Sequence, residues 1–232
     1  MDLSQPAHLA FILDGNRRWA KSNKLPSLMG HKRGYERAKD LVDAFIKHNI
    51  KYVSYFLFSS ENWNRSAEEI TYLMDLFRDF FKNSISYFHE KNVRVISIGN
   101  LKKLPQDLQE KIQKIEDETR NNDGLTLIAA ISYSGKDEIV RATRKIAEKV
   151  ASGKIKIDDI DENLFSSYLD TASIPYPDIL IRTSEKRISN FLLWQCAYSE
   201  IFFIDKYWPD FSEEDLEKVL DEFSKRNRRY GR

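Results

Sequence analysis

The amino-acid sequence predicts a single α/β domain with a central, mostly parallel sheet of about six strands flanked by helices. Apolar runs of strand length recur along the 232 residues with little polar alternation, which is typical of strands buried on both faces of a sheet. Segments with helical periodicity separate these runs, as in parallel sheets with right-handed crossovers. No linker rich in Gly, Ser or Pro divides the chain, so residues 1–232 are expected to form one domain.

The apolar runs place the strands at 8–13, 52–58, 93–98, 125–131, 179–181 and 201–204. Helical periodicity places helices near 33–48, 66–91, 105–120, 136–152, 161–169 and 212–228.

The expected helix at 66–91 has the clearest pattern. Ser66 and Glu69 form a capping box at its start. Eight apolar side chains then fall on one stripe, namely Ile70, Leu73, Met74, Phe77, Phe80, Phe81, Ile85 and Phe88. Such a stripe either packs into the core or lines part of an apolar tunnel, and the spacing fits both.

Composition narrows the class of protein. A net charge of +1 argues against a globally basic nucleic-acid binder. The single cysteine, Cys196, excludes an internal disulfide framework and suits a reducing compartment. The N-terminus lacks the pattern of a signal peptide, and no apolar run approaches the ~18–20 residues that cross a bilayer. We therefore expect a cytoplasmic globular protein.

Three polar clusters directly follow predicted strands. They are "DGNRR" at 14–18, "SSENWNR" at 59–65 and "RTSEKRISN" at 182–190. In an open parallel sheet the carboxyl ends of the strands share one edge, where ligand crevices form. Each cluster carries arginine with hydroxyl or amide groups, so together they predict a site for a polyanion.

The residue types suit phosphate. Arginine offers a planar fork that matches phosphate oxygens two at a time. Gly15 allows close backbone approach where a Cβ would clash. A carboxylate would repel phosphate, so Asp14 is best explained by a bridging hard cation such as Mg²⁺. The alternative for Asp14 is a salt bridge to Arg17 or Arg18, or a helix N-cap.

Other nucleotide and metal motifs are missing from the sequence. It contains neither GxxxxGK[ST] nor GxGxxG, and its four histidines have no metal-ligand spacing. His31 follows Gly30 at an apparent helix start, where backbone amides favour anions. It is either a phosphate ligand or a structural histidine.

Several long motifs resemble those of the cis-prenyltransferases, the undecaprenyl diphosphate synthase family. They are "HLAFILDGNRRWAK", "GHKRG", "FSSENWNR", "DILIRTS", "RISNFLLWQ", "YSE", "WPDF" and "RRYG", between residues 8 and 231. The resemblance implies a hydrophobic tunnel beside the sheet, a homodimer, and Mg²⁺-dependent cis addition of isopentenyl diphosphate to an allylic diphosphate such as farnesyl diphosphate. The implied product is a polyprenyl diphosphate, with undecaprenyl diphosphate as lipid carrier for cell-wall synthesis.

The resemblance also implies roles for single residues. Asp14 would hold Mg²⁺, with Glu200 assisting at the dimer interface. Asn16 and Asn62 would join Asp14 as catalytic residues. The allylic diphosphate would lie among Gly15, Asn16, Arg18 and His31, and Arg17 and Trp19 would also bind substrate. Isopentenyl diphosphate would be held by Arg182, Arg187 and Ser189. The active-site loop would use Ser59, Glu61, Asn62, Trp63 and Arg65, and Arg229 would reach into the neighbouring subunit.

The sequence departs from the family pattern at three places. Ser27 stands where an arginine is usual, the loop "TSEKR" after Arg182 is one residue short and lacks glycine, and Leu57 replaces a small residue of many long-chain members. Ser27 and the altered loop keep a non-catalytic partner subunit as an alternative, whereas Leu57 would shorten the product if it faces the tunnel. A phosphate-ester binding module without chemistry is a second alternative. No nucleic-acid partner is expected, and lipid products suggest loose association with a membrane surface.

Overall fold

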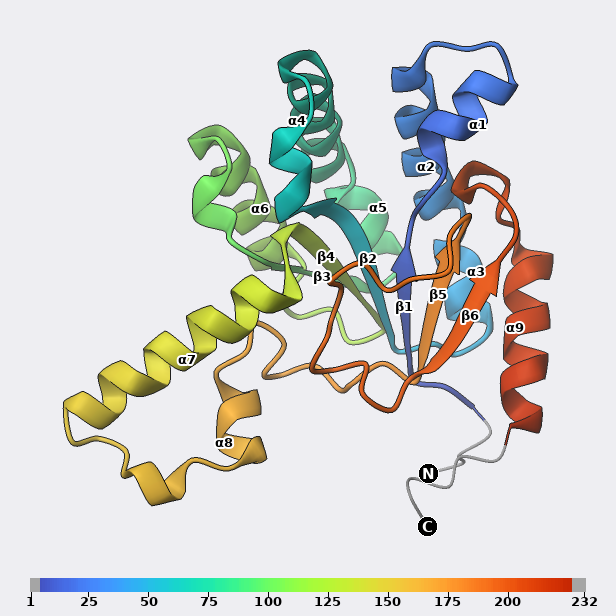
Figure 1. Ribbon diagram of the computed structural model, residues 1–232. Helices are drawn as coiled ribbons and strands as arrows, with labels where there is room; N and C mark the ends of the chain where they lie inside the picture. Colours follow the sequence, from blue (N-terminus) through green and yellow to red (C-terminus); the bar gives the residue numbers. More distant parts are fainter. Residues whose placement is uncertain (1–4, 227–232) are drawn as a thin grey trace.

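The computed structural model describes residues 5–226 (Figure 1). Its strands are β1 (His8–Ile12), β2 (Tyr52–Ser59), β3 (Val93–Ile98), β4 (Leu125–Tyr133), β5 (Ile179–Thr183) and β6 (Glu200–Ile204). They form one sheet in the order β3-β4-β2-β1-β5-β6, and every pairing is parallel. The predicted α/β class and all six predicted strands are confirmed.

Helices surround this sheet. They are α1 (Asn16–Ser22), α2 (Ser27–Asp40), α3 (Val42–Lys47), α4 (Ala67–Asn83), α5 (Ile85–Glu90), α6 (Gln106–Glu118), α7 (Gly135–Ala151), α8 (Glu162–Ser167) and α9 (Glu213–Lys225). Short 3₁₀ turns lie at Ser60–Asn64, Leu101–Lys103, Ile157–Asp159 and Trp208–Asp210.

Three helix predictions need correction. Helix α1 was not predicted, because it has seven mostly polar residues and no apolar stripe. The helix expected at 33–48 begins earlier, at Ser27, and is divided at Leu41 into α2 and α3. The helix expected at 66–91 is divided at the buried Ser84, which ends α4 and begins α5. Apolar periodicity continues across both breaks, so the pattern alone does not reveal them.

Two cores lie on opposite faces of the sheet, as the alternation of β1 illustrates. Leu9 and Phe11 face the larger core, which is formed with helices α3, α4, α5, α6 and α9. Ala10 and Ile12 face a smaller core, closed largely by the segment that follows β5 and includes Phe191. Every residue of β1 is buried, which explains why its sequence is apolar without alternation.

The central strands end side by side at one edge. Ile12 of β1 lies opposite Phe56 of β2 and Arg182 of β5, so the segments after these three strands start close together. Figure 1 shows β1, β2 and β5 pointing to the same edge, with α1 and the start of α4 beyond it. The predicted convergence of the three polar clusters therefore follows from the register.

A buried imidazole makes the fold sensitive to pH. His8 is almost fully buried, and its ring nitrogens lie 2.8 Å from Ser54 Oγ and 2.6 Å from the carbonyl oxygen of Pro175. Burial lowers the pKa of His8 to about 4. As the pH falls below 6.5, the unfolded chain therefore takes up a proton that the folded chain does not.

We predict that this group lowers the free energy of unfolding by about 2 kcal/mol between pH 7.5 and pH 5. Urea denaturation measures the free energy of unfolding at both pH values. In His8→Gln the decrease between pH 7.5 and pH 5 should be smaller than in the wild type by this amount. The matched variant His89→Gln removes a half-exposed histidine and should keep it. An equal decrease in His8→Gln and the wild type would contradict the assignment.

Candidate active site

A polar hollow of about 550 Å³ lies at the carboxyl edge of the sheet. It is lined by residues from all three polar clusters and from α2. Ten of the predicted site residues line it, namely Asp14, Asn16, His31, Ser59, Glu61, Asn62, Arg65, Arg182, Arg187 and Ser189. The hollow therefore brings together side chains that are up to 175 residues apart in the sequence.

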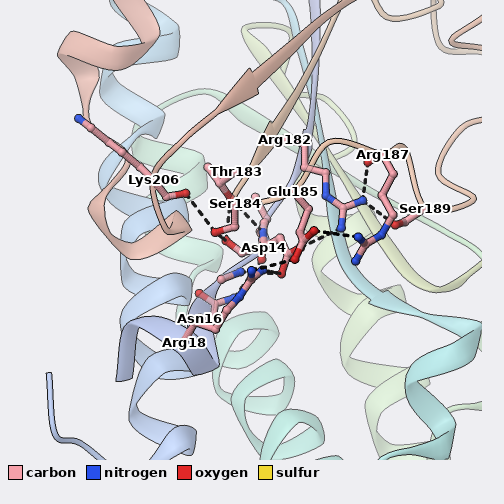
Figure 2. A network of polar contacts seen from close by, with 12 residues as sticks. Asp14, Asn16, Arg18, Arg182, Thr183, Ser184, Glu185, Arg187, Ser189 and Lys206 are labelled. Atoms are coloured by element: carbon pink, nitrogen blue, oxygen red, sulfur yellow. Dashed lines mark hydrogen bonds and ion pairs between the residues drawn. The ribbon is translucent and has the colours of Figure 1, made fainter. Parts of the chain in front are cut away.

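An ion pair between Asp14 and Arg182 lies at the centre of the polar network (Figure 2). Arg182 Nη2 donates to Asp14 Oδ2 at 2.8 Å, while Arg18 Nη2 and the Gly15 amide donate to Oδ1 at 3.2 and 2.7 Å. Burial alone would raise the pKa of Asp14, but the hydrogen bond and charge of Arg182, helped by Gly15 and Arg18, lower it below its ordinary value. Asp14 is therefore an anion among cations.

Arg182 also organises the loop that follows it. Its Nη1 donates to Ser189 Oγ and to the carbonyl oxygen of Arg187, so the guanidinium closes the loop on itself. Ser184 adopts a left-handed φ of 69°, a conformation in which glycine is usual. This serine makes the turn that the short, glycine-free loop needs, and Arg187 still lines the hollow.

Glu185 connects the first polar cluster with the third. It accepts from Arg18 Nη1 through Oε1 and from Arg187 Nη1 through Oε2, both at 2.8 Å (Figure 2). One carboxylate thus holds an arginine of the first cluster and an arginine of the third. Sequence analysis did not identify Glu185 as a site residue.

Gly15 is required by its surroundings. Its φ is +100°, and a Cβ there would lie 2.3 Å from Ser184 Oγ and 2.7 Å from the Tyr207 ring. The sequence interpretation assigned this glycine to close approach of a phosphate. The structure shows that it first allows the turn after β1 to pack against the loop after β5.

Glu69 gathers three cationic or titratable groups. Its side chain accepts from His31 Nε2 and Arg65 Nη1 at 3.0 Å each, and Arg17 Nη1 lies 3.6 Å away. Burial lowers the pKa of His31, while the hydrogen bond with Glu69 acts in the opposite direction. The predicted capping box is only half formed: Ser66 Oγ accepts from the Glu69 amide, but the Glu69 carboxylate turns to these partners instead.

The cluster after β2 forms a 3₁₀ turn beside the hollow. Asn62 Oδ1 accepts from the Ser59 amide at 3.1 Å, so this side chain caps the turn that presents it. Glu61 accepts from Asn190 Nδ2 at 3.0 Å, and Asn190 also donates to Ser134 Oγ. Asn190, which sequence analysis missed, therefore connects the second cluster with the third.

Two predicted tryptophans lie away from the polar hollow. Trp63 packs edge-on against Phe58 and donates to Ser132 Oγ at 3.0 Å. Trp19 donates to Asp210 Oδ1 at 2.7 Å. Both indole N–H groups have partners within the protein and neither ring lines the hollow, so the structure shows packing contacts for these residues, and their contact with substrate stays a prediction.

A second hollow, of about 680 Å³, adjoins the first and is strongly basic. Arg17, Arg18 and Gly15 line it, together with Ser27 at the position where the family usually has arginine. Five residues line both hollows, namely Leu13, Asp14, Asn16, His31 and Arg65. All of the predicted allylic-diphosphate residues except Trp19 therefore line this basic hollow, and Asn16 and His31 line the first hollow as well.

An apolar cavity of about 90 Å³ continues inward from the polar hollow. Leu13, Asn16, His31, Phe56, Leu57 and Leu73 line both spaces and form the neck between them. Along the stripe of α4 and α5, Leu73, Phe77, Phe80 and Phe88 line the cavity, whereas Met74 and Phe81 pack into the core. The stripe therefore serves both of the roles left open by its spacing.

Glu200 lies far from Asp14 within one chain. It is the first residue of β6, at the amino edge of the sheet, and it accepts from Arg226 Nη1 at 2.7 Å. Parallel strand direction separates it from the carboxyl edge, so the two acidic residues cannot share a metal within one copy. Arg229 lies outside the described residues.

The polar hollow suits a magnesium ion whose coordination shell is completed by phosphate oxygens of the substrate. Asp14 and Glu61 are the carboxylates that line it within the described chain. Mg²⁺ in such sites is typically held by one or two carboxylates together with substrate phosphates and water. Asp14, ionised and facing the hollow, is the residue that fits this role.

Comparison with known proteins agrees with this arrangement. A family model described as "Putative undecaprenyl diphosphate synthase" matches residues 12–231. The chain belongs to the undecaprenyl diphosphate synthase family. The predicted family is therefore confirmed, and with it the synthesis of polyprenyl diphosphates as the function class.

Relatives of this family differ in the products that they are named for. A ditrans,polycis-undecaprenyl-diphosphate synthase of Micrococcus luteus is 44% identical over 97% of this chain and 91% of its own length. A (2Z,6Z)-farnesyl diphosphate synthase of Solanum lycopersicum is 47% identical over 97% and 79%. A crystal structure of lavandulyl diphosphate synthase from Lavandula x intermedia, in complex with dimethylallyl diphosphate, superposes with a TM-score of 0.95 at 37% identity over 99% of both chains.

Within residues 5–226, the helices are too short or too polar to cross a membrane.

The contact between His31 and Glu69 generates a prediction. Removing the carboxylate charge with Glu69→Gln should lower the pKa of His31 further, because that charge favours the protonated ring. An NMR pH titration of the His31 ring measures this shift. Glu68→Gln, on the exposed neighbouring residue, is the matched control and should leave the titration unchanged. An unchanged or raised pKa in Glu69→Gln would refute the coupling.

Proposed function

We propose that this protein is a Mg²⁺-dependent cis-prenyltransferase that adds isopentenyl diphosphate to an allylic diphosphate such as farnesyl diphosphate. The observation that carries the proposal is one continuous space that is cationic at the sheet edge and apolar inside. A prenyl diphosphate has the same two halves, an anionic head and a hydrocarbon tail. The product is a polyprenyl diphosphate, and undecaprenyl diphosphate is the product that the family favours.

The two diphosphates occupy different parts of the edge. Asn16, Arg18 and His31 support an allylic diphosphate, since they line the basic hollow that adjoins the apolar cavity. Arg182, Arg187 and Ser189 lie together after β5 and support the isopentenyl diphosphate. Asp14 lies between the two groups, where it would hold Mg²⁺. That ion, when bound, supplies positive charge to the departing diphosphate.

The residues of the chain supply position and charge for the reaction. Arginines fixed at the strand ends stabilise negative charge that grows on the leaving diphosphate. Holding both substrates in one hollow places the double bond of isopentenyl diphosphate beside the allylic carbon. A proton then leaves the new chain. An amide is a poor base, so a diphosphate oxygen is the favoured acceptor, and Asn16 at the neck would orient the reacting carbons.

The apolar cavity receives the growing tail. Moving one five-carbon unit from water into this space gains about 4 kcal/mol, at ~0.8 kcal/mol per buried carbon group. Phe77, Phe80 and Phe88 form part of the wall that the tail would contact. The energy of this burial favours movement of each new unit inward through the neck.

A second copy of the chain would bring Glu200 to the metal site. Strand β6 is the edge of the sheet, and beside it Tyr198, Ile201 and Phe203 expose apolar surface. Unpaired edge strands with exposed apolar side chains are usually covered by a partner. These features support the homodimer that the family implies. The buried Cys196 supports a cytoplasmic location.

The purified chain tests the proposal directly. Given farnesyl diphosphate, radiolabelled isopentenyl diphosphate and Mg²⁺, it should form labelled lipid alone. A non-catalytic partner subunit would form product only after an active homologue is added. A binding module would bind pyrophosphate without forming any product. Either of these results would refute the proposal.

Asp14→Ala should lower the elongation rate by a factor of about 10²–10³, because it removes the group proposed to hold the ion. Thermal unfolding checks that the variant stays folded. Asp40→Ala removes an exposed carboxylate paired with Arg33, and should keep the wild-type rate. Elongation by Asp14→Ala at close to the wild-type rate would show that the metal is held elsewhere.

Leu57→Ala should lengthen the product by one or more five-carbon units, because Leu57 narrows the neck between the two cavities. Chromatographic sizing of dephosphorylated products measures the change. Leu220→Ala, on the outer helix α9 and away from the cavities, should leave the distribution as in the wild type. Unchanged product length in Leu57→Ala would show that the neck does not limit elongation.

A further inference from the structure

The turn between α1 and α2 has an unusual surface. Residues 21–27 are all exposed, and Figure 1 shows this turn beyond the carboxyl edge of the sheet. Leu25 is 41% exposed and Met29, in the first turn of α2, is 42% exposed. Two large apolar side chains thus face solvent at the most distal part of this helical pair. We name residues 21–33 the α1–α2 tip.

The tip is also strongly basic. Residues 21–33 contain four Lys or Arg residues and no Asp or Glu, and Arg17 and Arg18 precede them in α1. Arg17, Arg18 and Arg33 have carboxylate partners. By contrast, none of Lys21, Lys24 and Lys32 has an ion-pair partner within the described part of the chain. Three ammonium groups without a carboxylate partner therefore lie on the same exposed segment as the two apolar side chains.

We propose that the α1–α2 tip docks on the surface of an anionic lipid bilayer. Exposed apolar side chains next to lysines match the membrane–water interface. There the apolar groups enter the acyl boundary, and the ammonium groups contact the phosphate headgroups. A nucleic acid would use the lysines, but its phosphate backbone would leave Leu25 and Met29 without an apolar environment. The combination of charge and apolar exposure selects a lipid surface.

The location gives this docking a role, which rests on the proposed function. Lys21, Lys24 and Leu25 line the basic hollow that also contains Asp14 and His31. A tip that rests on headgroups places the mouth of this hollow at the level of the membrane. A prenyl diphosphate then passes between bilayer and site without exposing its tail to water, and exposure of that tail is costly.

The α7–α8 connection offers a matched control surface. Ile157 and Ile160 are 72% and 42% exposed there, and Lys154 and Lys156 lie beside them. Acidic residues at 158, 159, 161 and 162 also surround these isoleucines. This surface therefore has comparable apolar exposure without an excess of positive charge.

Sedimentation with extruded vesicles, in the absence of substrate, tests the proposal on the full chain. Wild-type protein should bind phosphatidylglycerol vesicles at least tenfold more tightly than phosphatidylcholine vesicles, and salt should weaken the binding. Lys21→Gln/Lys24→Gln/Lys32→Gln should reduce binding about 100-fold, since each lysine near an anionic surface contributes roughly fivefold. Leu25→Ser/Met29→Ser should reduce it about tenfold or more. Ile157→Ser/Ile160→Ser should bind like the wild type.

Equal binding to both kinds of vesicle, or equal losses in the tip and control variants, would overturn the proposal. A soluble polyanion such as heparin gives a further test. If heparin fully releases the protein from phosphatidylglycerol vesicles and Leu25→Ser/Met29→Ser binds like the wild type, the site recognises charge alone and the proposal is overturned. Elongation in detergent distinguishes this failure from failure of the proposed function. Met29→Ser/Lys32→Gln, which leaves the linings of the cavities intact, should bind vesicles more weakly yet elongate at the wild-type rate.

Discussion

The ion pair between Asp14 and Arg182 is the contact on which the rest of the site depends. The Arg182 side chain is only 4% exposed, and a guanidinium buried to this extent is costly without an opposite charge beside it. Asp14 supplies that charge from the neighbouring strand end, while Ser189 and the Arg187 carbonyl take the other side of the guanidinium. One buried cation therefore fixes the end of β1 against the loop after β5.

This pair is also what makes the site chemically suitable. A cationic pocket without Asp14 would bind phosphate but would lack the carboxylate that contacts both Arg18 and Arg182. A carboxylate without arginines would repel the substrate. Because Arg18 and Arg182 both contact Asp14, the group proposed to hold the metal and the groups proposed to hold diphosphate lie within hydrogen-bonding distance of one another. Binding of a metal diphosphate would replace these internal partners with the ligand's own charges.

Much of the fold and of the site could be predicted from local sequence. Strands buried on both faces are largely apolar along their length, so the apolar runs that contain β1 and β4 can be recognised as strands from the sequence. Polar clusters that follow such runs must meet at one edge if the strands are parallel, and the register confirms that they do. The resemblance to a family then assigned roles that residue types alone left open.

What sequence could not reveal depends on tertiary contacts. A tryptophan in a site motif can face the ligand or the core, and for Trp63 the hydroxyl of Ser132 decides the direction. Glu69 has the spacing of a capping residue, yet two nearby cationic or titratable partners hold its carboxylate elsewhere. Glu200 lies in the motif "YSE", which resembles one of the family, but strand direction places it at the opposite edge from Asp14. The four-residue separation between Arg65, which precedes α4, and Glu69 in the first turn of α4 is a sequence signal that could have identified Glu69 in advance.

Calorimetric titration with inorganic pyrophosphate, with and without Mg²⁺, tests the central claim most directly. If the strand ends form one metal-diphosphate site, wild-type protein should bind pyrophosphate more tightly with Mg²⁺. Asp14→Asn should abolish the magnesium effect but keep metal-free binding, and Arg182→Gln should weaken both. Equal magnesium enhancement in Asp14→Asn and the wild type, or unchanged binding in Arg182→Gln, would contradict the account.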